Sequence, residues 1–425
     1  MAAFPTVKLA DCVDLLAGFA FKSQHFTDRP DDIPLVKGEN VSQGCILWEI
    51  SKRWSAADWP NLEKFQLRSG DVVVAMDRPW VPAGLKWAYI RSDDAKALLV
   101  QRCSRLRSNT PRLDQNFLRF VIGGPCFESY VIPITTGVNV PHISGKQILD
   151  YEFALPPLPV QQRIAGILSA YDELIENSQR RIKILESMAR ALYREWFVHF
   201  RFPGHEHHPR VASPLGEIPQ GWEVKKLCDL ISIDKGVSYN GAGLTAGGNP
   251  MVNLKNIMAG GGFRRDATKP YSGAFKPRHT VKPGDIVLAN TDLTQAGNVV
   301  ASAALIPRFA DDRPILISHH LFAVRLSEDL PASFIYHLLL EDGFRGFAKG
   351  YAIGTTVLGL PKEGVLNFTF ALASENLIGD FVKHAAPMHQ LIEMLLEKKE
   401  NLRRTRDLLL PRLLSGQIEA RPPEP

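Results

Sequence analysis

Cysteine is scarce in this chain of 425 residues. The five cysteines lie far apart and form no C-x-x-C pair: Cys12, Cys45, Cys103, Cys126 and Cys228. An odd number of widely spaced cysteines supports neither a disulfide framework nor a zinc knuckle. The sequence therefore favours a reduced, cytoplasmic setting.

Long apolar runs are also missing. No stretch approaches the roughly 18 apolar residues that a membrane-spanning helix needs. The first residues, Met1 to Pro5, have neither the basic flank nor the apolar core of a secretory signal. We expect a soluble protein with no membrane contact.

The short motifs that mark common active sites are absent. The nearest approach to a phosphate-binding P-loop, Gly137 to Lys146, has seven residues between its glycines and continues with Gln147 instead of Ser or Thr. No G-x-G-x-x-G follows a strand-like run, and no H-E-x-x-H or G-x-S-x-G occurs. The Asn-Pro-Pro-aromatic motif of amino-methyltransferases is missing as well. We therefore predict no cofactor, no metal and no catalytic residue.

Neither sign of charge dominates the composition. Lys plus Arg minus Asp plus Glu is 50 − 45 = +5, with a pI near 8.8, which permits a polyanionic partner without requiring one. Apolar residues make up 45% and charged residues 22%, so large-scale disorder is excluded. At roughly 150 residues per domain, the length predicts about three domains.

An internal repeat is present. Three residues return 218 positions later, Leu9, Asp11 and Gly18 as Leu227, Asp229 and Gly236. Longer runs return at offsets between 214 and 218, among them residues 70–75 as 284–289 and residues 153–155 as 370–372. A chance match would not keep the offset within this narrow range over half of the chain. We predict a tandem duplication in which each half is a mixed α/β globule followed by a long helix, an α+β fold.

The two long helices are expected over residues 157–200 and 374–418, with Pro387 starting or kinking the second. Their apolar residues recur every three or four positions, the spacing of a coiled-coil seam, with polar interruptions at Ser178, Lys399 and Arg406. Such a stripe also fits homodimerisation or ordinary core packing. In a duplicated chain, however, the two helices can pair antiparallel about a pseudo-twofold axis. The predicted pairing residues are Ile164, Leu168, Tyr171, Ile175, Ile182, Leu185, Leu192, Met388, Ile392, Leu395, Leu402 and Leu409.

The remaining boundaries follow from these helices. The first globule covers residues 1–156 and the second 215–373, and residues 419–425 form a C-terminal tail. Residues 201–214 are polar and contain proline, as expected of a linker. His205, His207 and His208 lie in this linker, but without Cys or carboxylate partners at ligand spacing a solvated role is favoured over a metal site.

Two similar globules held apart by a rod would suit an elongated partner with two separated sites, such as duplex DNA. Arg and Lys suit guanine and phosphate, Asn and Gln suit adenine, and small hydroxyls suit phosphate. Equivalent polar loops of the two globules differ in sequence, so the globules should read different bases. The candidates in the first globule are Lys37, Asn40, Arg78, Lys86, Thr135, Thr136, Asn139, His142 and Lys146. Those in the second globule are Asn253, Lys255, Asn256, Asn290, Thr291, Thr294, Gln295, Asn298, Lys349, Thr355 and Thr356. For any single one of them, an ordinary solvated surface role is the competing interpretation.

Three motifs give the sequence a resemblance to the DNA-specificity subunits of type I restriction-modification systems. They are the helix entry Leu155 to Leu168, the start of the second globule at Gly216 to Trp222, and the tail Leu408 to Ile418. The architecture resembles that family over nearly the whole chain. Val160 departs from the family pattern, which often has Glu there.

The resemblance implies two target-recognition domains, each contacting one half of a bipartite site in double-stranded DNA, with the paired helices setting the spacer. It also implies a non-catalytic subunit that binds two adenine-methylating modification subunits, which ATP-driven restriction subunits join. Two alternatives stay open. One is a self-contained DNA methyltransferase or nuclease with an unrecognised active site, and the other is a scaffold whose globules no longer read DNA.

Overall fold

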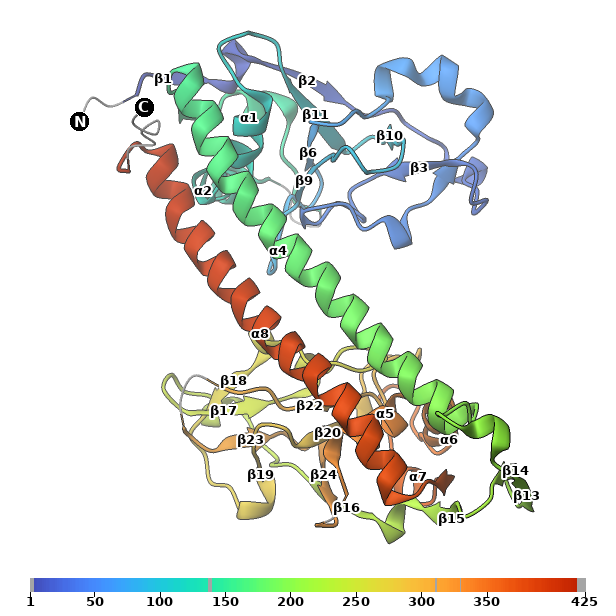
Figure 1. Cartoon of the computed structure of the whole chain (residues 1–425). Helices are drawn as coiled ribbons and strands as arrows, with labels where there is room; N and C mark the ends of the chain where they lie inside the picture. The colour runs from blue at the N-terminus through green and yellow to red at the C-terminus, as the bar shows by residue number, and fades with distance from the viewer. Residues whose placement is uncertain (1–3, 137–139, 310–311, 329, 419–425) are drawn as a thin grey trace, which may run out of the picture. The chain divides into compact units, whose positions relative to one another are not determined.

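Two long helices are the longest elements of the chain: α4 covers Leu158–Tyr193 and α8 covers Glu375–Leu414. The computed structural model describes residues 4–136, 140–309, 312–328 and 330–418. These form two units, unit 1 from Met1–Asn177 with Lys398–Pro425 and unit 2 from Ser178–Glu397. Each unit therefore contains one globule and a part of each long helix (Figure 1).

The main sheet of unit 1 has the strand order β2-β11-β6-β9-β4, antiparallel except for the pair β4–β9. Its central strand β6 (Val72–Ala75) is buried on both faces, and its side chains alternate between two cores. Val72 and Val74 pack with helix α1, whereas Val73 and Ala75 pack against a second, three-stranded sheet of order β10-β3-β5. The other strands are β2 Val13–Ala17, β3 Ile33–Val36, β4 Gln43–Gly44, β5 Arg53–Trp54, β9 Trp87–Tyr89, β10 Leu98–Leu99 and β11 Cys103–Ser108. Two short pairs complete the unit: β1 Thr6–Lys8 with β12 Glu152–Ala154, and β7 Trp80–Val81 with β8 Gly84–Leu85.

Three short helices cover the first core, α1 Gln115–Ile122, α2 Pro125–Ile134 and α3 Gly145–Leu149. Asp114 caps α1 by accepting a hydrogen bond from the Phe117 backbone N–H at 2.8 Å. Pro125 opens α2, a position where its missing N–H costs nothing. No single described helix is long and apolar enough to cross a membrane. The pair α1 and α2, bent by 53°, meets that criterion jointly, but the apolar side of α1 is buried in this core.

Unit 2 has the same plan. Its main sheet has the order β16-β24-β20-β22, and its second sheet the order β18-β17-β23-β19. The central strand β20 (Ile286–Ala289) again divides its side chains, with Ile286 and Leu288 packing with helix α5 and Val287 and Ala289 with the second sheet. The elements are β15 Glu223–Lys226, β16 Ile231–Lys235, β17 Asn249–Val252, β18 Lys269–Tyr271, β19 Thr280–Val281, β22 Ala303–Leu305, β23 Ile315–Ile317, β24 Leu321–Leu326, α5 Ala332–Leu340, α6 Asp342–Gly350, α7 Glu363–Leu366 and β26 Thr369–Leu372.

Within each unit the two long helices pack on each other. In unit 1, Leu168 of α4 lies in one apolar cluster with Leu410 and Leu413 of α8, and Asp172 pairs with Arg406 further along, so the two helices run in opposite directions there. In unit 2, Ile182 packs with Ile392 and Leu395. The predicted seam residues Ile164, Leu168, Ile175, Ile182, Ile392 and Leu395 are buried, and Tyr171, Leu185, Leu192, Met388, Leu402 and Leu409 are half-buried.

One sequence expectation needs correction here. Pro387 does not start the second helix, because α8 already begins at Glu375 and continues through Pro387 at the loss of one backbone hydrogen bond. The expected linker over 201–214 is partly ordered: Phe202 is buried, and β13 (Arg210–Ser213) pairs with β14 (Gly216–Pro219). The polar composition of residues 201–214 did not indicate the burial of Phe202 or the pairing of β13 with β14.

Two of the linker histidines make hydrogen bonds to nearby backbone carbonyls. The His205 Nδ1 lies 2.8 Å from the Phe202 carbonyl, and the His208 Nε2 lies 2.8 Å from the Gln220 carbonyl. Over the part of the chain that the structure describes, no group of three or more His, Cys, Asp or Glu side chains is placed to hold a metal ion.

Candidate nucleic-acid interface

Three segments of unit 1 meet where β6 ends. The Met76 N–H donates to the Arg102 carbonyl at 2.7 Å, and the Ile143 N–H donates to the Met76 carbonyl at 2.9 Å. Asp77 and His142 then form a backbone bridge. The turn before β11 and the segment leading into α3 are thereby fixed against the end of β6. This arrangement brings residues from three predicted polar loops to one place.

The side chains at this place form what we call the Asp77 cluster: Asp77, Arg78, Lys86, Arg102 and His142. One Asp77 carboxylate oxygen lies 2.6 Å from His142 Nδ1 and 3.5 Å from Arg102 Nη1. Lys86 donates to the Gly38 carbonyl, and burial lowers the pKa of this lysine below its ordinary value. The Asp77 carboxylate therefore holds His142 and Arg102 together at the end of β6.

Arg78 is the most available member of the Asp77 cluster. Its backbone N–H donates to the Pro141 carbonyl at 2.6 Å, and its φ of 45° is uncommon for a residue with a side chain. The side chain is exposed, and no described residue accepts a hydrogen bond from its guanidinium group. The backbone is thus fixed while the five N–H donors remain open to a ligand.

The other predicted residues of unit 1 differ in their exposure and in their hydrogen-bond partners. Asn40 is fully buried, and its side chain accepts from the Lys37 N–H at 2.9 Å and donates to the Leu35 carbonyl at 2.9 Å, so it holds a turn and we do not retain it as a DNA contact. Lys37 pairs with Glu39 at 3.0 Å. Thr135 donates to the carbonyl of Val131 at 2.7 Å. Thr136 and Lys146 are exposed, and Asn139 lies outside the described residues.

Unit 2 builds an equivalent site with the same backbone bonds. The Asn290 N–H donates to the His320 carbonyl at 3.0 Å, and the Leu360 N–H donates to the Asn290 carbonyl at 2.8 Å. Thr291 pairs with Gly359 where β21 (Thr291–Asp292) meets β25 (Leu358–Gly359). These bonds match those of unit 1 position by position. The equivalent residues are Asn290 and Met76, His320 and Arg102, Leu360 and Ile143, Thr291 and Asp77, and Gly359 and His142. The two sites therefore share one backbone frame.

Asp292 fixes the loop that follows this frame in unit 2. Its side chain is 2% exposed and accepts from the backbone N–H groups of Thr294 at 2.9 Å, Val299 at 2.7 Å and Val300 at 3.2 Å, and from the Thr294 hydroxyl at 2.8 Å. Burial alone would raise the pKa of Asp292, but these hydrogen bonds outweigh it and the pKa lies below its ordinary value. The loop is therefore held rigidly around an ionised carboxylate.

This loop and the segment before β25 each expose an aliphatic side chain. Leu293 is 59% exposed, and Ile353, which exchanges two backbone hydrogen bonds with Gly359 at 2.9 and 2.8 Å, is 74% exposed. Gln295 donates its side-chain amide to the Thr355 carbonyl, which joins the two exposed loops. Of the predicted residues, Lys255, Thr294, Gln295, Asn298, Thr355 and Thr356 are exposed and Lys349 is half-buried.

Four other predicted residues of unit 2 are not available. Asn253, Asn256, Asn290 and Thr291 are buried. The side-chain Oδ1 of Asn256 accepts a hydrogen bond from the Asn253 backbone N–H at 2.8 Å. Asn40 makes the same bond to the Lys37 backbone N–H in unit 1, where it holds a turn. We do not retain these four as DNA contacts, because their polar groups are occupied within the fold.

Sequence reasoning missed Arg102 and its equivalent His320. Both lie in the tight turn that enters the strand beside the central strand, and Arg102 has a φ of 70°. The adjacent pair His319-His320 is conspicuous in the sequence, but no neighbouring motif indicates that it lies beside the polar loops. Burial lowers the pKa values of His319 and His320, and the charge of Lys235 lowers them further. Leu293 and Ile353 were missed because only polar residues were considered.

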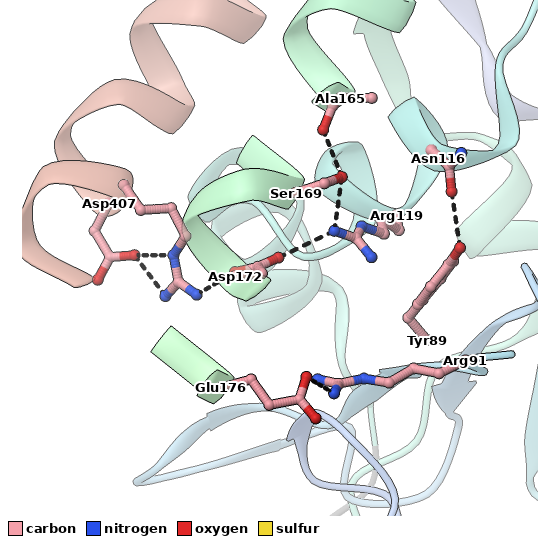
Figure 2. A network of polar contacts seen from close by, with 10 residues as sticks. Tyr89, Arg91, Asn116, Arg119, Ala165, Ser169, Asp172, Glu176 and Asp407 are labelled. Atoms are coloured by element: carbon pink, nitrogen blue, oxygen red, sulfur yellow. Dashed lines mark hydrogen bonds and ion pairs between the residues drawn. The ribbon is translucent and has the colours of Figure 1, made fainter. Parts of the chain in front are cut away.

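Each unit also attaches its globule to the long helices. In unit 1, Asp172 of α4 pairs with Arg119 of α1 at 3.1 Å and with Arg406 of α8 at 2.7 Å (Figure 2). Arg119 also donates to the Ser169 hydroxyl at 3.0 Å, and Arg91 pairs with Glu176. This attachment is a network of charges on a single face of α4.

The corresponding attachment in unit 2 is mostly aromatic. His337 of α5 stacks on Tyr193 of α4 with ring centroids 6.0 Å apart, and it lies 5.1 Å from the His389 ring of α8. Burial, together with the adjacent His389, lowers the pKa of His337 to about 3. At neutral pH this histidine is therefore uncharged.

Comparison with known proteins relates the chain to one family. The family model for the type I restriction modification DNA specificity domain matches residues 2–187. The chain is similar to the specificity subunits of type I restriction enzymes. It is 25% identical to the type I restriction enzyme MjaVIII specificity subunit of Methanocaldococcus jannaschii, over 77% of this chain and 75% of that protein. It is 24% identical to the MjaIX specificity subunit of the same organism, over 71% of this chain and 68% of that protein.

The fold agrees with this assignment. The S subunit of a type I restriction-modification system from M. genitalium superposes with a TM-score of 0.57 at 14% identity, covering 97% of this chain and 96% of that one. At that identity the likeness concerns the fold alone. It confirms the α+β fold predicted from the sequence.

Proposed function

We propose that this protein binds double-stranded DNA at a bipartite site, with each unit reading one half-site. The observation that carries the proposal is the pair of sites built on one backbone frame, each of which presents accessible side chains from rigid loops. A duplicated reader suits a partner that repeats along one axis, as DNA does. Because the side chains on the two frames differ, the two half-sites should differ in sequence.

We also propose the domain limits set out from the sequence: target-recognition domains at residues 1–156 and 215–373, and helical segments at 157–200 and 374–418. The matching hydrogen bonds of the two frames support an origin by tandem duplication. On this proposal the long helices pair as an antiparallel coiled coil that sets the spacer between the half-sites. Their packing within each unit supports this role.

The protein is proposed to be non-catalytic. Methyl transfer and ATP-dependent cleavage would belong to partners, two modification subunits and the restriction subunits, with the modification subunits docking on the helices. Both curated relatives described above are named as specificity subunits of restriction enzymes. Because its proposed ligand is the DNA of the cell, we place the protein in the cytoplasm.

Selection from randomised duplexes tests the proposal. The full chain, co-purified with the modification subunits of its host, is incubated with a random duplex pool and the bound fraction is sequenced. The proposal expects one motif of two short conserved blocks separated by a fixed unspecific spacer. Enrichment of a single continuous block, or of no sequence, would contradict it.

Methyl transfer to plasmid DNA by the chain alone, in the presence of S-adenosylmethionine, would favour the alternative of a self-contained methyltransferase. The non-catalytic proposal expects no transfer until modification subunits are added.

A further inference from the structure

The two frames present opposite chemistry at equivalent positions. Where unit 1 has Arg102 and His142, the same hydrogen-bonding positions in unit 2 hold His320 and Gly359. The acidic Asp77 that gathers the cations of unit 1 is replaced by Thr291. Unit 2 retains a nearby cation in Lys235, but the frame itself carries no arginine. The first frame thus presents two arginines, whereas the second presents no arginine or lysine and keeps the carboxylate of Asp292 buried.

The free groups on the frames differ accordingly. Arg78 offers a guanidinium group that donates to none of the described residues, on a fixed backbone. Ile353 occupies the position that Thr136 has in unit 1, in the same backbone bridge. Leu293 and Ile353 are 59% and 74% exposed, although the backbone beneath them is fixed by Asp292 and Gly359. Exposed aliphatic side chains on a rigid loop lose little conformational freedom when they are covered, so they suit a specific apolar contact.

Base edges in the major groove offer a partner for each chemistry. A guanidinium group donates two hydrogen bonds to the O6 and N7 atoms of guanine, and only thymine presents a methyl group. We infer that unit 1 reads guanine through Arg78, with Arg102 neutralising phosphate, and that unit 2 reads thymine methyl groups through Leu293 and Ile353. This inference rests on the proposed function.

Base analogues test the inference once the motif is known. Replacing guanine by 7-deazaguanine removes the N7 acceptor, and replacing thymine by uracil removes the methyl group, while neither change alters the pairing. We expect 7-deazaguanine to lower the affinity about five- to one-hundredfold in the half-site of unit 1. Uracil should lower it about fourfold per lost methyl contact in the half-site of unit 2.

Variants then assign each effect to a side chain. In Arg78→Ala the 7-deazaguanine effect should vanish, and in Leu293→Ala or Ile353→Ala the uracil effect should vanish at one thymine each. Matched controls are Arg112→Ala and Leu408→Ala, which change exposed residues outside both frames. They should leave both analogue effects intact, and circular dichroism confirms that each variant is folded.

The outcomes separate the inference from the proposed function. If the unmodified chain selects no bipartite motif, the proposed function itself fails. If it selects one, but the analogue effects persist undiminished in the variants or occur equally in both half-sites, the two-unit function stands and this assignment of bases is overturned.

Discussion

Asp172 on α4 accepts a hydrogen bond from Arg406 on α8 at 2.7 Å, while its other carboxylate oxygen accepts one from Arg119 on α1 at 3.1 Å. One carboxylate thereby connects the globule of unit 1 to both long helices. Arg406 is also one of the polar residues that interrupt the apolar stripe in the sequence. The interruption is therefore a specific tertiary contact.

Replacing Asp172 by alanine should destabilise unit 1. The change leaves two partly buried guanidinium groups without their shared acceptor, so we expect a loss of about 1–3 kcal/mol in the free energy of unfolding. Urea unfolding monitored by circular dichroism measures it. The matched control is Asp380→Ala, which removes an exposed i,i+3 pair with Lys383 and should change little. Equal stability of the two variants would show that the Asp172 network does not hold the globule.

The stability of unit 2 should fall in acid because of His337. Its pKa is about 3 in the folded protein, against an ordinary value of 6.5 that it regains on unfolding. Above pH 6.5 the group is neutral in both states; between pH 6.5 and 3 only the unfolded chain takes up the proton. Stability should thus decline by about 2 kcal/mol from pH 7 to pH 5 through this group.

Urea midpoints at pH 7 and pH 5 measure this decline, and His337→Phe removes the titrating group. The variant should show a smaller loss on acidification than the parent chain. Arg190 faces the same cluster and His389 also titrates there, so the variant should retain a part of the dependence. An unchanged dependence would contradict the assignment to His337.

Asp292→Ala should loosen the exposed loop of unit 2 without affecting unit 1. The carboxylate holds the backbone N–H groups of Val299 and Val300, so both amides should exchange with deuterium faster once it is removed. Thr294→Ala, which deletes only the hydroxyl bond to Asp292, is the milder control. Hydrogen exchange with mass spectrometry resolves the peptides concerned. Retained protection of residues 294–300 in Asp292→Ala would mean that the loop has another support.

DNA binding should depend on salt in proportion to the phosphates neutralised. The logarithm of the association constant is expected to fall linearly with the logarithm of the salt concentration, with a slope of about −0.9 per phosphate. Arg102→Gln should reduce the magnitude of that slope by about one phosphate, because it removes an exposed charge of the Asp77 cluster. Lys64→Gln, an exposed charge on another segment of unit 1, should leave it unchanged. A slope near zero for the parent chain would favour a scaffold that does not bind DNA.

The sequence predicted the elements with local signals well and the site residues poorly. The apolar spacing predicted two long helices, and the structure has α4 at Leu158–Tyr193 and α8 at Glu375–Leu414. Asn40 and Asn256 also stood out as a matched pair, but the match reflects a shared turn. Whether a polar side chain faces solvent or its own backbone depends on tertiary contacts that the local pattern does not contain.

Other features depended on distant contacts in the same way. Pro387 lies within a helix that packing in unit 2 stabilises, so its local preference was overridden. Arg102 meets Asp77 only because the turn before β11 is bonded to the end of β6. Leu293 is exposed because Asp292 holds its loop, and no local signal in an aliphatic residue could indicate that.

An exchange of residues 1–156 for those of a relative with a different motif tests the central claim of two independent readers most directly. The hybrid chain is produced with its modification subunits, and the methylated motif is mapped by sequencing the host DNA. We expect one half-site to change to that of the relative, with the other half-site and the spacer retained. A simultaneous change of both half-sites, or of neither, would contradict the account.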